Sequence, residues 1–281
     1  MLSAIWTAGV LKSEGPRSEV LKSGALGSEA LGSGAILFEA RAYRGKGWRL
    51  VEAQHRVSTL KLVDTLAEQA VLEEVLEASK PPIPEACRGL DYLLGTPFRY
   101  RPYPQGSRFR RAGFTPGVWY GAERVETALA EMVFYRLLFY AEAPEVPFPD
   151  GAAEYTGFAV PLATAVALDL TVEPLVRDAA LWRHPTEYGA CQALAEAARE
   201  AGVEVLRAAS VRDPAGRANL AVLSSAAFGA RAPVERQTWR IKVGAWGAQA
   251  LREHPAKAVE FGREAFAGDP RMADMRWERG R

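Results

Sequence analysis

The chain has 281 residues, of which 48% are apolar, and a formal net charge of +1 at pH 7. That apolar content can bury one large core or two modest ones, and we expect a single folded body behind a loose leader. The near-zero net charge excludes a global attraction to nucleic acid or membranes, so an anion has to be recognised by a local cluster of side chains.

The cysteines and the hydropathy of the chain indicate in which cellular compartment we expect the protein. Cys87 and Cys191 lack CxxC spacing, and a single disulfide would be a poor framework for a chain of this length. No basic segment followed by an apolar core opens the chain, and no stretch reaches the roughly 18 uninterrupted apolar residues that span a bilayer. We therefore expect a cytoplasmic protein without a membrane-bound part.

Residues 1–42 are predicted to form a low-complexity leader. Serines recur at an interval of five residues, at Ser13, Ser18, Ser23, Ser28 and Ser33. A period of five matches neither the 3.6 residues of a helical turn nor the alternation of a strand, so no apolar stripe forms. We expect a flexible or weakly docked leader, and we place the folded body in residues 43–281.

Hydrophobic spacing and breaker residues predict the elements of the body in chain order. The predicted helices cover 59–78, 123–140 and 186–201, and the predicted strands cover 117–120, 157–160, 164–170, 203–206, 219–223 and 239–243. Ser58 is the expected N-cap of the first helix, and one or two further helices are expected after the last strand. Strands and helices that mix without strict alternation predict an α+β fold.

Glu131 stands out because the run 128–135 around it carries no other charge. Arg136 is five residues away and lies on another face of the helix, so Glu131 has no partner four residues along. Two interpretations stay open: a carboxylate at a helix edge that reaches solvent or a distant arginine, and a carboxylate held in a cleft facing a substrate. Tyr120 ends the strand that leads into this helix, so both side chains can line one wall of a pocket.

Residues 98–111 contain five arginines, four aromatic residues and no acid. Arginine offers a planar fork to phosphate oxygens and the rings offer stacking faces, so a dinucleotide and single-stranded nucleic acid are both compatible. A solvated loop whose arginines pair with acids elsewhere is equally compatible. Within this segment, Arg108 is the arginine that we place nearest to a pocket.

Three further positions are candidates. Arg56 precedes the first long helix, where its guanidinium can share an anion with the free N–H groups of the helix, and Arg49 competes for the same role. Ser210 lies in a turn-rich loop, where a serine commonly satisfies the backbone. His55, His184 and His254 have no metal-binding spacing, so we expect no metal site. Characteristic motifs of Rossmann, P-loop, zincin and α/β-hydrolase proteins are absent.

Four short patterns follow one another in order. They are His55-Arg56-Val57-Ser58, Gly106-Ser107-Arg108-Phe109, Gly117-Val118-Trp119-Tyr120 with Ala128-Leu129-Ala130-Glu131, and Ser210-Val211-Arg212-Asp213-Pro214 with Asn219. Their order and the step from Tyr120 to Glu131 resemble the RES domain family over roughly residues 48–228. The chain departs from the compact members between Arg56 and Gly106, where it carries a helix and a proline-rich connection, and in its extension after Phe228.

The resemblance implies an ADP-ribosyltransferase-like mixed sheet core with flanking helices. It also implies an NAD-consuming toxin that needs no cofactor beyond NAD as substrate and is neutralised by a helix-turn-helix antitoxin partner. A homo-oligomer stays open, and nucleic acid is not expected as a partner. The acceptor of the ADP-ribose group stays open between water, inorganic phosphate and a protein side chain. An ADP-ribosyltransferase that modifies a protein is therefore one alternative. A non-catalytic nucleic-acid-binding module and an inactive relative kept for protein association are the others.

The same resemblance assigns roles to seven residues. Glu131 would stabilise the positive charge that develops on the ribose when nicotinamide leaves, as carboxylates do in glycoside cleavage. Arg56 would hold the pyrophosphate, with Arg108 or Arg49 as candidates for that role. Tyr120 would stack on nicotinamide, and Ser210 and Asn219 would position the ribose or the amide.

Overall fold

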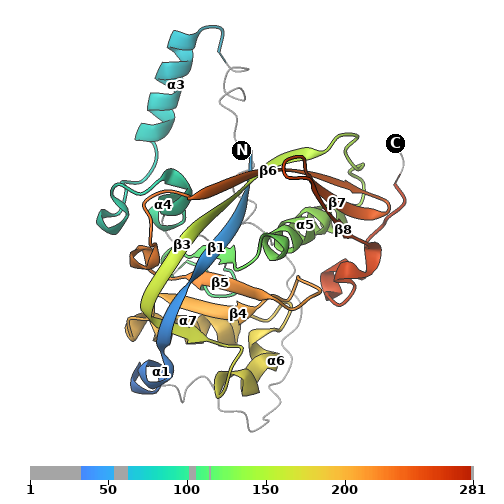
Figure 1. The fold of residues 1–281 in the computed structure, drawn as a ribbon. Coiled ribbons are helices and arrows are strands. Elements are labelled where there is room, and N and C mark those ends of the chain that lie inside the picture. The colour runs from blue at the N-terminus through green and yellow to red at the C-terminus, as the bar shows by residue number, and fades with distance from the viewer. Residues whose placement is uncertain (1–32, 54–62, 101–105, 114, 280–281) are drawn as a thin grey trace.

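The computed structural model describes residues 33–53, 63–100, 106–113 and 115–279 (Figure 1). Most of the predicted leader and the candidates Arg56 and Ser58 lie outside these residues. None of the helices in the described part of the chain is long and apolar enough to cross a bilayer.

An eight-stranded mixed sheet forms the centre of the fold. Its strands are β1 (Arg41–Glu52), β2 (Trp119–Ala122), β3 (Ala153–Asp169), β4 (Val205–Ala209), β5 (Ala218–Val222), β6 (Glu235–Gly244), β7 (Gly247–Arg252) and β8 (Lys257–Phe261). The order across the sheet is β1-β2-β5-β4-β3-β6-β7-β8. Only the pairing of β3 with β4 is parallel among these strands.

The sheet closes on itself because β1 has two partners. It pairs with β3 over almost its full length and also meets β2 where Trp48 faces Ala122. Strands β1, β2, β5, β4 and β3 therefore form a closed ring, while β6, β7 and β8 extend from the other half of β3. The mixed sheet with flanking helices agrees with the predicted class, but the expected ADP-ribosyltransferase-like sheet core is corrected to a small closed barrel with an extension.

Strand β3 makes this closure possible by its length. One edge pairs with β1 throughout, while the opposite edge pairs with β6 at residues 153–159 and with β4 at residues 167–169. The sequence predicted two strands separated at Pro161. Pro161 lies in the stretch between the two partners of that edge, where its missing N–H interrupts neither ladder, so the chain continues as one strand.

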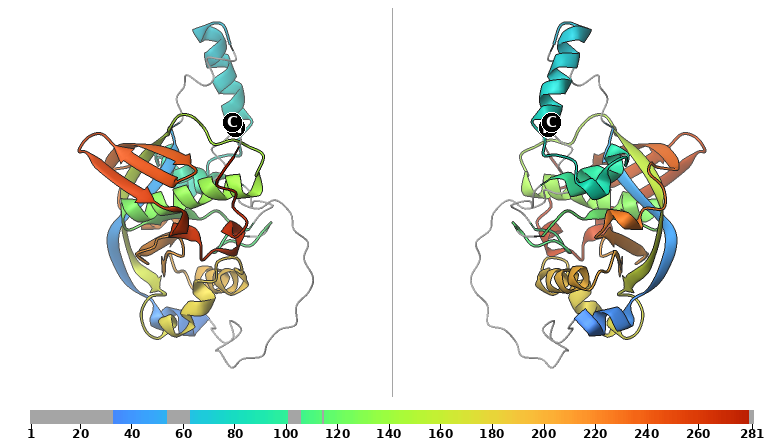
Figure 2. Two further views of the ribbon diagram at one scale, coloured as in Figure 1. Left: turned by 90° about the vertical axis from the view of Figure 1, so that its right-hand side faces the viewer. Right: turned by 90° about the vertical axis from the view of Figure 1, so that its left-hand side faces the viewer.

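The helices that flank the sheet are α1 (Ser33–Glu39), α3 (Leu66–Ala78), α4 (Tyr92–Arg99), α5 (Val125–Glu142), α6 (Ala179–Trp182) and α7 (Gly189–Glu200). Short 3-10 turns are η2 (Glu85–Cys87), η3 (Leu175–Asp178), η4 (Ser225–Ala227), η5 (Arg263–Phe266) and η6 (Pro270–Met272). Figures 1 and 2 show α3 standing apart from the rest of the fold, with α6 and α7 at the opposite end of the molecule.

Three clusters of buried side chains make up the core. One cluster receives buried residues from β2, β3, β4 and β5, among them Trp119 and Phe158, and partly buried residues of β1 pack against it. Another packs α5 against β1, β6, β7 and β8, and most residues of α5 are buried, as expected of a helix that is apolar on nearly all sides. The last packs α1, α6 and α7 against β4 and β5. Ile36 of α1 is buried there, so the described end of the predicted leader packs on the body.

Two predicted elements differ in the structure. The first long helix begins at Leu66, and its N-cap is Thr65, whose hydroxyl accepts from the Glu68 N–H while the Glu68 carboxylate accepts from the Thr65 N–H. The predicted start at 59 and its predicted N-cap Ser58 lie outside the described residues, and the helix that the structure describes starts at a complete capping box. The one or two helices expected after the last predicted strand are the short 3-10 helices η5 and η6, and the hairpin β7–β8 that precedes them was not predicted.

Candidate functional site

The strand register brings the candidate residues to one face of the sheet. Tyr120 lies opposite Ala221 and Ala122 lies opposite Asn219 in the antiparallel pair of β2 and β5. Cross-strand partners share a face and side chains alternate along each strand, so Tyr120 and Asn219 lie on the same face. Helix α5 begins directly after β2 and carries Glu131, and the connection from β4 to β5 carries Ser210.

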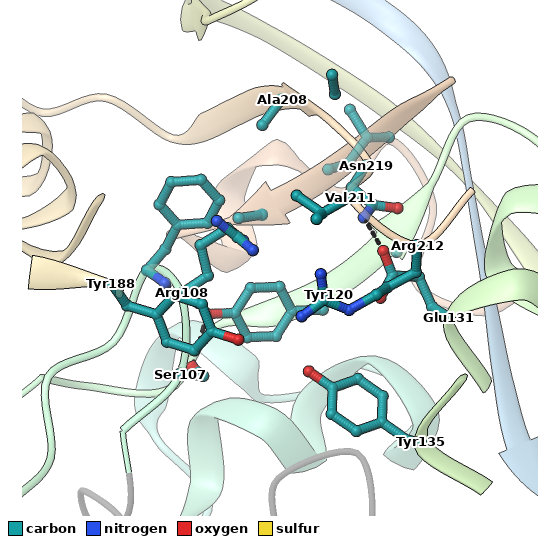
Figure 3. Close-up of a pocket in the computed structure, with 15 residues that line it drawn as sticks. Ser107, Arg108, Tyr120, Glu131, Tyr135, Tyr188, Ala208, Val211, Arg212 and Asn219 are labelled. Atoms are coloured by element: carbon teal, nitrogen blue, oxygen red, sulfur yellow. Dashed lines mark hydrogen bonds between the residues drawn. The ribbon is translucent and has the colours of Figure 1, made fainter. Parts of the chain in front are cut away.

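Glu131 is buried at 8% exposure, and its carboxylate is held by two neutral donors. Ser210 Oγ donates to Glu131 Oε1 at 2.7 Å. Asn219 Nδ2 donates to the same oxygen, as Figure 3 shows. Within the described residues, no hydrogen bond reaches Oε2 and no arginine or lysine pairs with this carboxylate. Of the two interpretations of Glu131, the structure supports a carboxylate held in a cleft.

The hydroxyl of Ser210 has all of its hydrogen-bonding capacity in use. It accepts from the backbone N–H groups of Arg212 at 3.1 Å and Asp213 at 3.0 Å, and it donates its single hydrogen to Glu131. The residue is 1% exposed. Ser210 therefore orients Glu131 and offers no free lone pair or hydrogen to a substrate, so the role that the resemblance implies for it shifts from substrate contact to carboxylate positioning.

Asn219 also orients Glu131, and it keeps a polar atom free. Its Nδ2 donates to Glu131, while its buried Oδ1 has no hydrogen-bond partner among the described residues. A buried acceptor without a partner carries a desolvation cost of about 1–3 kcal/mol. This oxygen is consequently suited to accept a hydrogen bond from a bound molecule.

Tyr120 is fixed by the loop that precedes β2. Its hydroxyl shares a hydrogen bond of 2.7 Å with Ser107 Oγ and accepts from the Phe109 N–H at 3.1 Å. Burial raises the pKa of Tyr120, although the bonds from Ser107 and Phe109 oppose that shift. The phenol therefore stays neutral at physiological pH and presents its ring to the cavity beside it.

A cavity of about 70 Å³ joins these residues. Its lining includes Ser107, Arg108, Phe109, Tyr120, Glu131, Tyr135, Tyr188, Val211, Arg212 and Asn219 (Figure 3). Four of the seven predicted residues line this cavity, and Ser210 is a fifth at the site because it hydrogen-bonds to Glu131. Three tyrosines, one carboxylate and two arginines make the site both aromatic and charged.

Arg108 lies on one side of the cavity. Its Nη1 donates to the Trp182 carbonyl at 2.7 Å, and its guanidinium lies 4.7 Å from the centre of the Tyr188 ring. Tyr188 donates in turn to the Pro185 carbonyl at 2.9 Å. The α6–α7 region thereby fixes both side chains, which supports the expectation that Arg108 is the arginine of the 98–111 segment nearest to a pocket.

Arg212 is a site residue to which sequence reasoning gave no role. Its side chain is 4% exposed, its guanidinium lies 4.3 Å from the centre of the Phe134 ring, and its Nη2 donates to the Pro185 carbonyl at 2.8 Å. Its Nη2 also lies 3.1 Å from Asp269 Oδ2. An arginine in a turn-rich loop is expected to be exposed to solvent. Its acidic partner, Asp269, comes from the distant C-terminal segment. The only signal was its place inside the Ser210–Pro214 pattern.

Asp213 locks the loop that carries Ser210 onto α5. The Thr127 hydroxyl donates to Asp213 Oδ2 at 2.6 Å, and Arg217 binds both carboxylate oxygens at 2.6 and 2.9 Å. Burial would raise the pKa of Asp213, but the bonds from Arg217 and Thr127 outweigh it and hold the pKa below its ordinary value. The loop is thereby fixed to the helix that carries Glu131.

Arg49 does not lie in the cavity beside Glu131. It faces Phe158 across the β1–β3 pair, its guanidinium lies 5.9 Å from the Trp119 ring, and its Nη1 donates to the Tyr120 carbonyl at 3.3 Å. Burial lowers the pKa of Arg49 to about 10. The structure therefore places Arg49 on the opposite face of β2 from the cavity, against the wall that Tyr120 forms, and Arg56 lies outside the described residues.

A second and larger cavity of about 1160 Å³ lies elsewhere. It is bounded by α3, α4, β1 and β6 and is lined by Arg49, Tyr92, Arg99 and Arg136, among others. Size alone would favour it as a ligand site. The buried carboxylate with a free oxygen lies at the smaller cavity, however, and that cavity is therefore the candidate functional site.

Apart from Arg108, the arginines of the 98–111 segment are paired with acids or buried where the structure describes them. Arg99 pairs with Glu77 at 2.6 Å, Arg111 binds Glu196 through two bonds, and Arg110 is 4% exposed. They do not form an open basic face for nucleic acid. In the described ranges, no group of three or more His, Cys, Asp or Glu side chains is arranged to hold a metal ion.

Comparisons with known proteins show to which family the chain belongs. No curated protein matches it. Among solved structures, it is similar to the crystal structure of the M. tuberculosis MbcT–MbcA toxin-antitoxin complex, with 15% identity and a TM-score of 0.44 over 75% of this chain and 91% of that one. The model of the RES domain matches residues 82–244. This range begins after Arg49 and Arg56, later than the expected start at 48, and extends past the expected end at 228. Because the match covers more than half of the chain and contains Arg108, Tyr120, Glu131, Ser210 and Asn219, the chain belongs to the RES domain family.

Proposed function

We propose that this protein cleaves the bond between nicotinamide and ribose in NAD. The observation that carries the proposal is the carboxylate of Glu131, which is buried beside a cavity and held through Oε1 by Ser210 and Asn219 while Oε2 stays free. Departure of nicotinamide leaves positive charge on the ribose. A fixed carboxylate in a site of low dielectric constant stabilises that charge without reorganising.

The neutral donors around Glu131 suit this role. An arginine or lysine paired with the carboxylate would cancel part of the field that it exerts on the sugar. Ser210 and Asn219 fix its position without adding a charge. The free Oδ1 of Asn219 can accept from a ribose hydroxyl or from the carboxamide of nicotinamide.

The remaining lining suits the other parts of the dinucleotide. The rings of Tyr120, Tyr135 and Tyr188 offer stacking surfaces to nicotinamide, and Arg108 and Arg212 are the cations that a diphosphate needs. The cavity of about 70 Å³ is smaller than the roughly 300–1,000 Å³ of most ligand pockets. We therefore propose that it takes the nicotinamide riboside end, with the adenosine end toward its mouth.

The decisive experiment is incubation of the purified protein with NAD, with and without inorganic phosphate, followed by identification of the products. ADP-ribose would indicate water as acceptor, an ADP-ribose phosphate would indicate phosphorolysis, and label transferred to protein would indicate an ADP-ribosyltransferase. NAD that is unchanged after prolonged incubation would contradict the proposal.

Glu131→Gln tests the residue that carries the proposal. It should reduce NAD consumption by about a hundredfold or more, because loss of one fixed electrostatic partner of the transition state typically costs that much. Glu142→Gln on the same helix is the matched control, since Glu142 is exposed and lies outside the cavity lining. Equal NAD consumption by the two variants would show that Glu131 does not carry the reaction.

The biological setting that the family resemblance implies stays part of the proposal. An NAD-consuming enzyme in the cytoplasm would act as a toxin and would need a neutralising partner, for which we propose a helix-turn-helix antitoxin. Co-expression with the product of a neighbouring gene of that type should restore growth and give a complex on gel filtration. Growth unaffected by expression of the active protein alone would contradict the toxin role.

A further inference from the structure

The C-terminal segment beyond the RES match returns to the candidate site. It begins after β8, beyond the matched residues 82–244, and its short turns η5 and η6 pack on α5. The ring centres of Phe266 and of Phe134 in α5 lie 5.6 Å apart, and Met272 and Met275 belong to the same buried cluster. The segment is therefore part of the core that supports the helix carrying Glu131.

Asp269 is the buried acid of this segment, at 5% exposure. Its side chain caps η6 by accepting from the Arg271 N–H at 3.0 Å and binds the Arg271 guanidinium through both oxygens at 2.9 Å. Oδ2 also lies 3.1 Å from Arg212 Nη2. The charges of Arg271 and Arg212, together with the bonds from Arg271, outweigh burial and keep the pKa of Asp269 below its ordinary value.

These contacts orient the Arg212 guanidinium. Nη2 is engaged by Asp269 and the Pro185 carbonyl, and one face rests on Phe134. Nε and Nη1 are buried and have no hydrogen-bond partner among the described residues. The side chain lines the same cavity as Glu131 (Figure 3), and no ion pair joins the two within the described structure.

The charges of this cluster favour an anion. Two guanidinium groups, those of Arg212 and Arg271, share the single carboxylate of Asp269, so one positive charge is left over. A buried guanidinium with unpartnered N–H groups is a strong donor to phosphoryl oxygens, because both charge and hydrogen bonds contribute. Asp269 occupies one end of the guanidinium, which leaves the remaining donors for a ligand.

We propose that Asp269 is a positioning residue that holds Arg212 so that its unpartnered N–H groups bind a phosphoryl group of the ligand in this cavity. The inference rests on the proposed function, because NAD carries a diphosphate beside the ribose that Glu131 would face. Free inorganic phosphate, a candidate acceptor, presents the same chemistry. The two sources are distinguished by the probes used below.

The test compares the wild type with Asp269→Asn by calorimetric titration of ADP-ribose, inorganic phosphate and nicotinamide riboside. Asparagine keeps the size of the side chain and is a good N-cap, so η6 stays capped while Arg212 loses the ion pair that orients its guanidinium. ADP-ribose affinity should fall about tenfold or more, the typical loss for a hydrogen bond to a charged group. Nicotinamide riboside, which has no phosphate, should bind as it does to the wild type. If Asp269→Asn lowers the affinity for inorganic phosphate alone, Arg212 binds free phosphate. If it lowers the affinity for ADP-ribose, Arg212 binds the diphosphate.

Two controls separate positioning from a general loss of stability. Asp91→Asn changes another capping aspartate that pairs with an arginine, Arg236, and that lies outside the cavity lining. It should leave all three affinities unchanged. In an Arg212→Ala background, Asp269→Asn should have no further effect on ADP-ribose affinity, because Asp269 acts through Arg212. If Asp269→Asn does not fold, Arg212→Lys replaces it, since lysine keeps the charge and loses the planar donors.

The outcomes distinguish this inference from the proposed function. ADP-ribose and phosphate affinities unchanged in Asp269→Asn, or in its replacement Arg212→Lys, would overturn the inference even if the wild type consumes NAD. A wild type that binds neither of these two phosphate-containing probes would overturn it as well. A wild type that leaves NAD intact but binds phosphate in a way that depends on Asp269 would overturn the proposed function and support this inference.

Discussion

At the scale of single residues, the site depends on how completely each hydrogen-bonding group is satisfied. Ser210 has its one hydrogen and both lone pairs in use, so it is a support for Glu131 and has no capacity left for a substrate. Asn219 Oδ1 and two nitrogen atoms of Arg212 are buried without a partner in the described residues. Both hydrogen bonds to Glu131 end on Oε1, which leaves Oε2 free among these residues. The unsatisfied atoms mark what a ligand would contact.

Ser210→Ala tests this distinction between support and substrate contact. Removing a hydrogen bond to a carboxylate costs about 1.5–3 kcal/mol, so NAD consumption should fall by roughly tenfold to a hundredfold. The same substitution in a Glu131→Gln background should change the rate little, because the hydroxyl acts through the carboxylate. A further large loss in the double variant would show that Ser210 has a role of its own.

At the scale of elements, the loop between β4 and β5 is fastened to α5 by the hydrogen bond from Thr127 to Asp213, and Arg217 of the same loop holds the Asp213 carboxylate. This contact sets the distance between Ser210, which belongs to the loop, and Glu131, which belongs to the helix. A strand-to-helix junction alone would leave that distance undefined. The buried carboxylate of Asp213 is therefore as important to the site as the residues that line the cavity.

Thr127→Val should destabilise the protein by about 1–3 kcal/mol at pH 7, because it leaves a buried carboxylate short of one donor. The pKa of Asp213 is lower in the folded state than in the unfolded state, so its contribution is present above about pH 4 and is lost as the pH falls through the folded pKa. Urea unfolding at pH 7 and pH 3 should therefore show a smaller difference between wild type and variant at pH 3. A difference that stays constant or grows would contradict this account.

At the scale of the whole molecule, the barrel closes at a tight contact between β1 and β2. A Cβ on Gly121 would lie 2.3 Å from the Trp119 ring and 2.9 Å from the Trp48 carbonyl oxygen. The ring strands approach this closely only because residue 121 has no side chain. Closure holds β2, and with it Tyr120, in place beneath the cavity.

Gly121→Ala should consequently destabilise the fold by about 1–3 kcal/mol, as overpacking of a filled core does. Gly151→Ala is the control, because a Cβ there would meet no atom within 4 Å. Thermal unfolding should show a lower Tm for Gly121→Ala alone. Equal Tm values for the two variants would show that the contact between β1 and β2 accommodates a side chain at residue 121.

The sequence alone was sufficient for features whose signals are local. The uncharged run around Glu131 singled out a carboxylate on a helix but left open whether it reaches solvent or lies in a cleft. The apolar segments predicted the helix 123–140 and the strands that became β2, β4 and β5. The order of short patterns also identified the family. The predicted helix and strands depend on residues that lie within a few turns of one another, and the family resemblance depends on the order of patterns that are each short and local.

Only the tertiary structure decided the rest, because the deciding partners are far apart in the chain. Closure of the barrel depends on the pairing of β1 with both β2 and β3, and the sequence of β1 alone does not predict two partner strands. Ser210 became a support and Arg212 a buried cation through contacts with Glu131 and Asp269 that no local pattern encodes. Burial and pairing set the chemical role of a polar side chain, and both are properties of the folded chain.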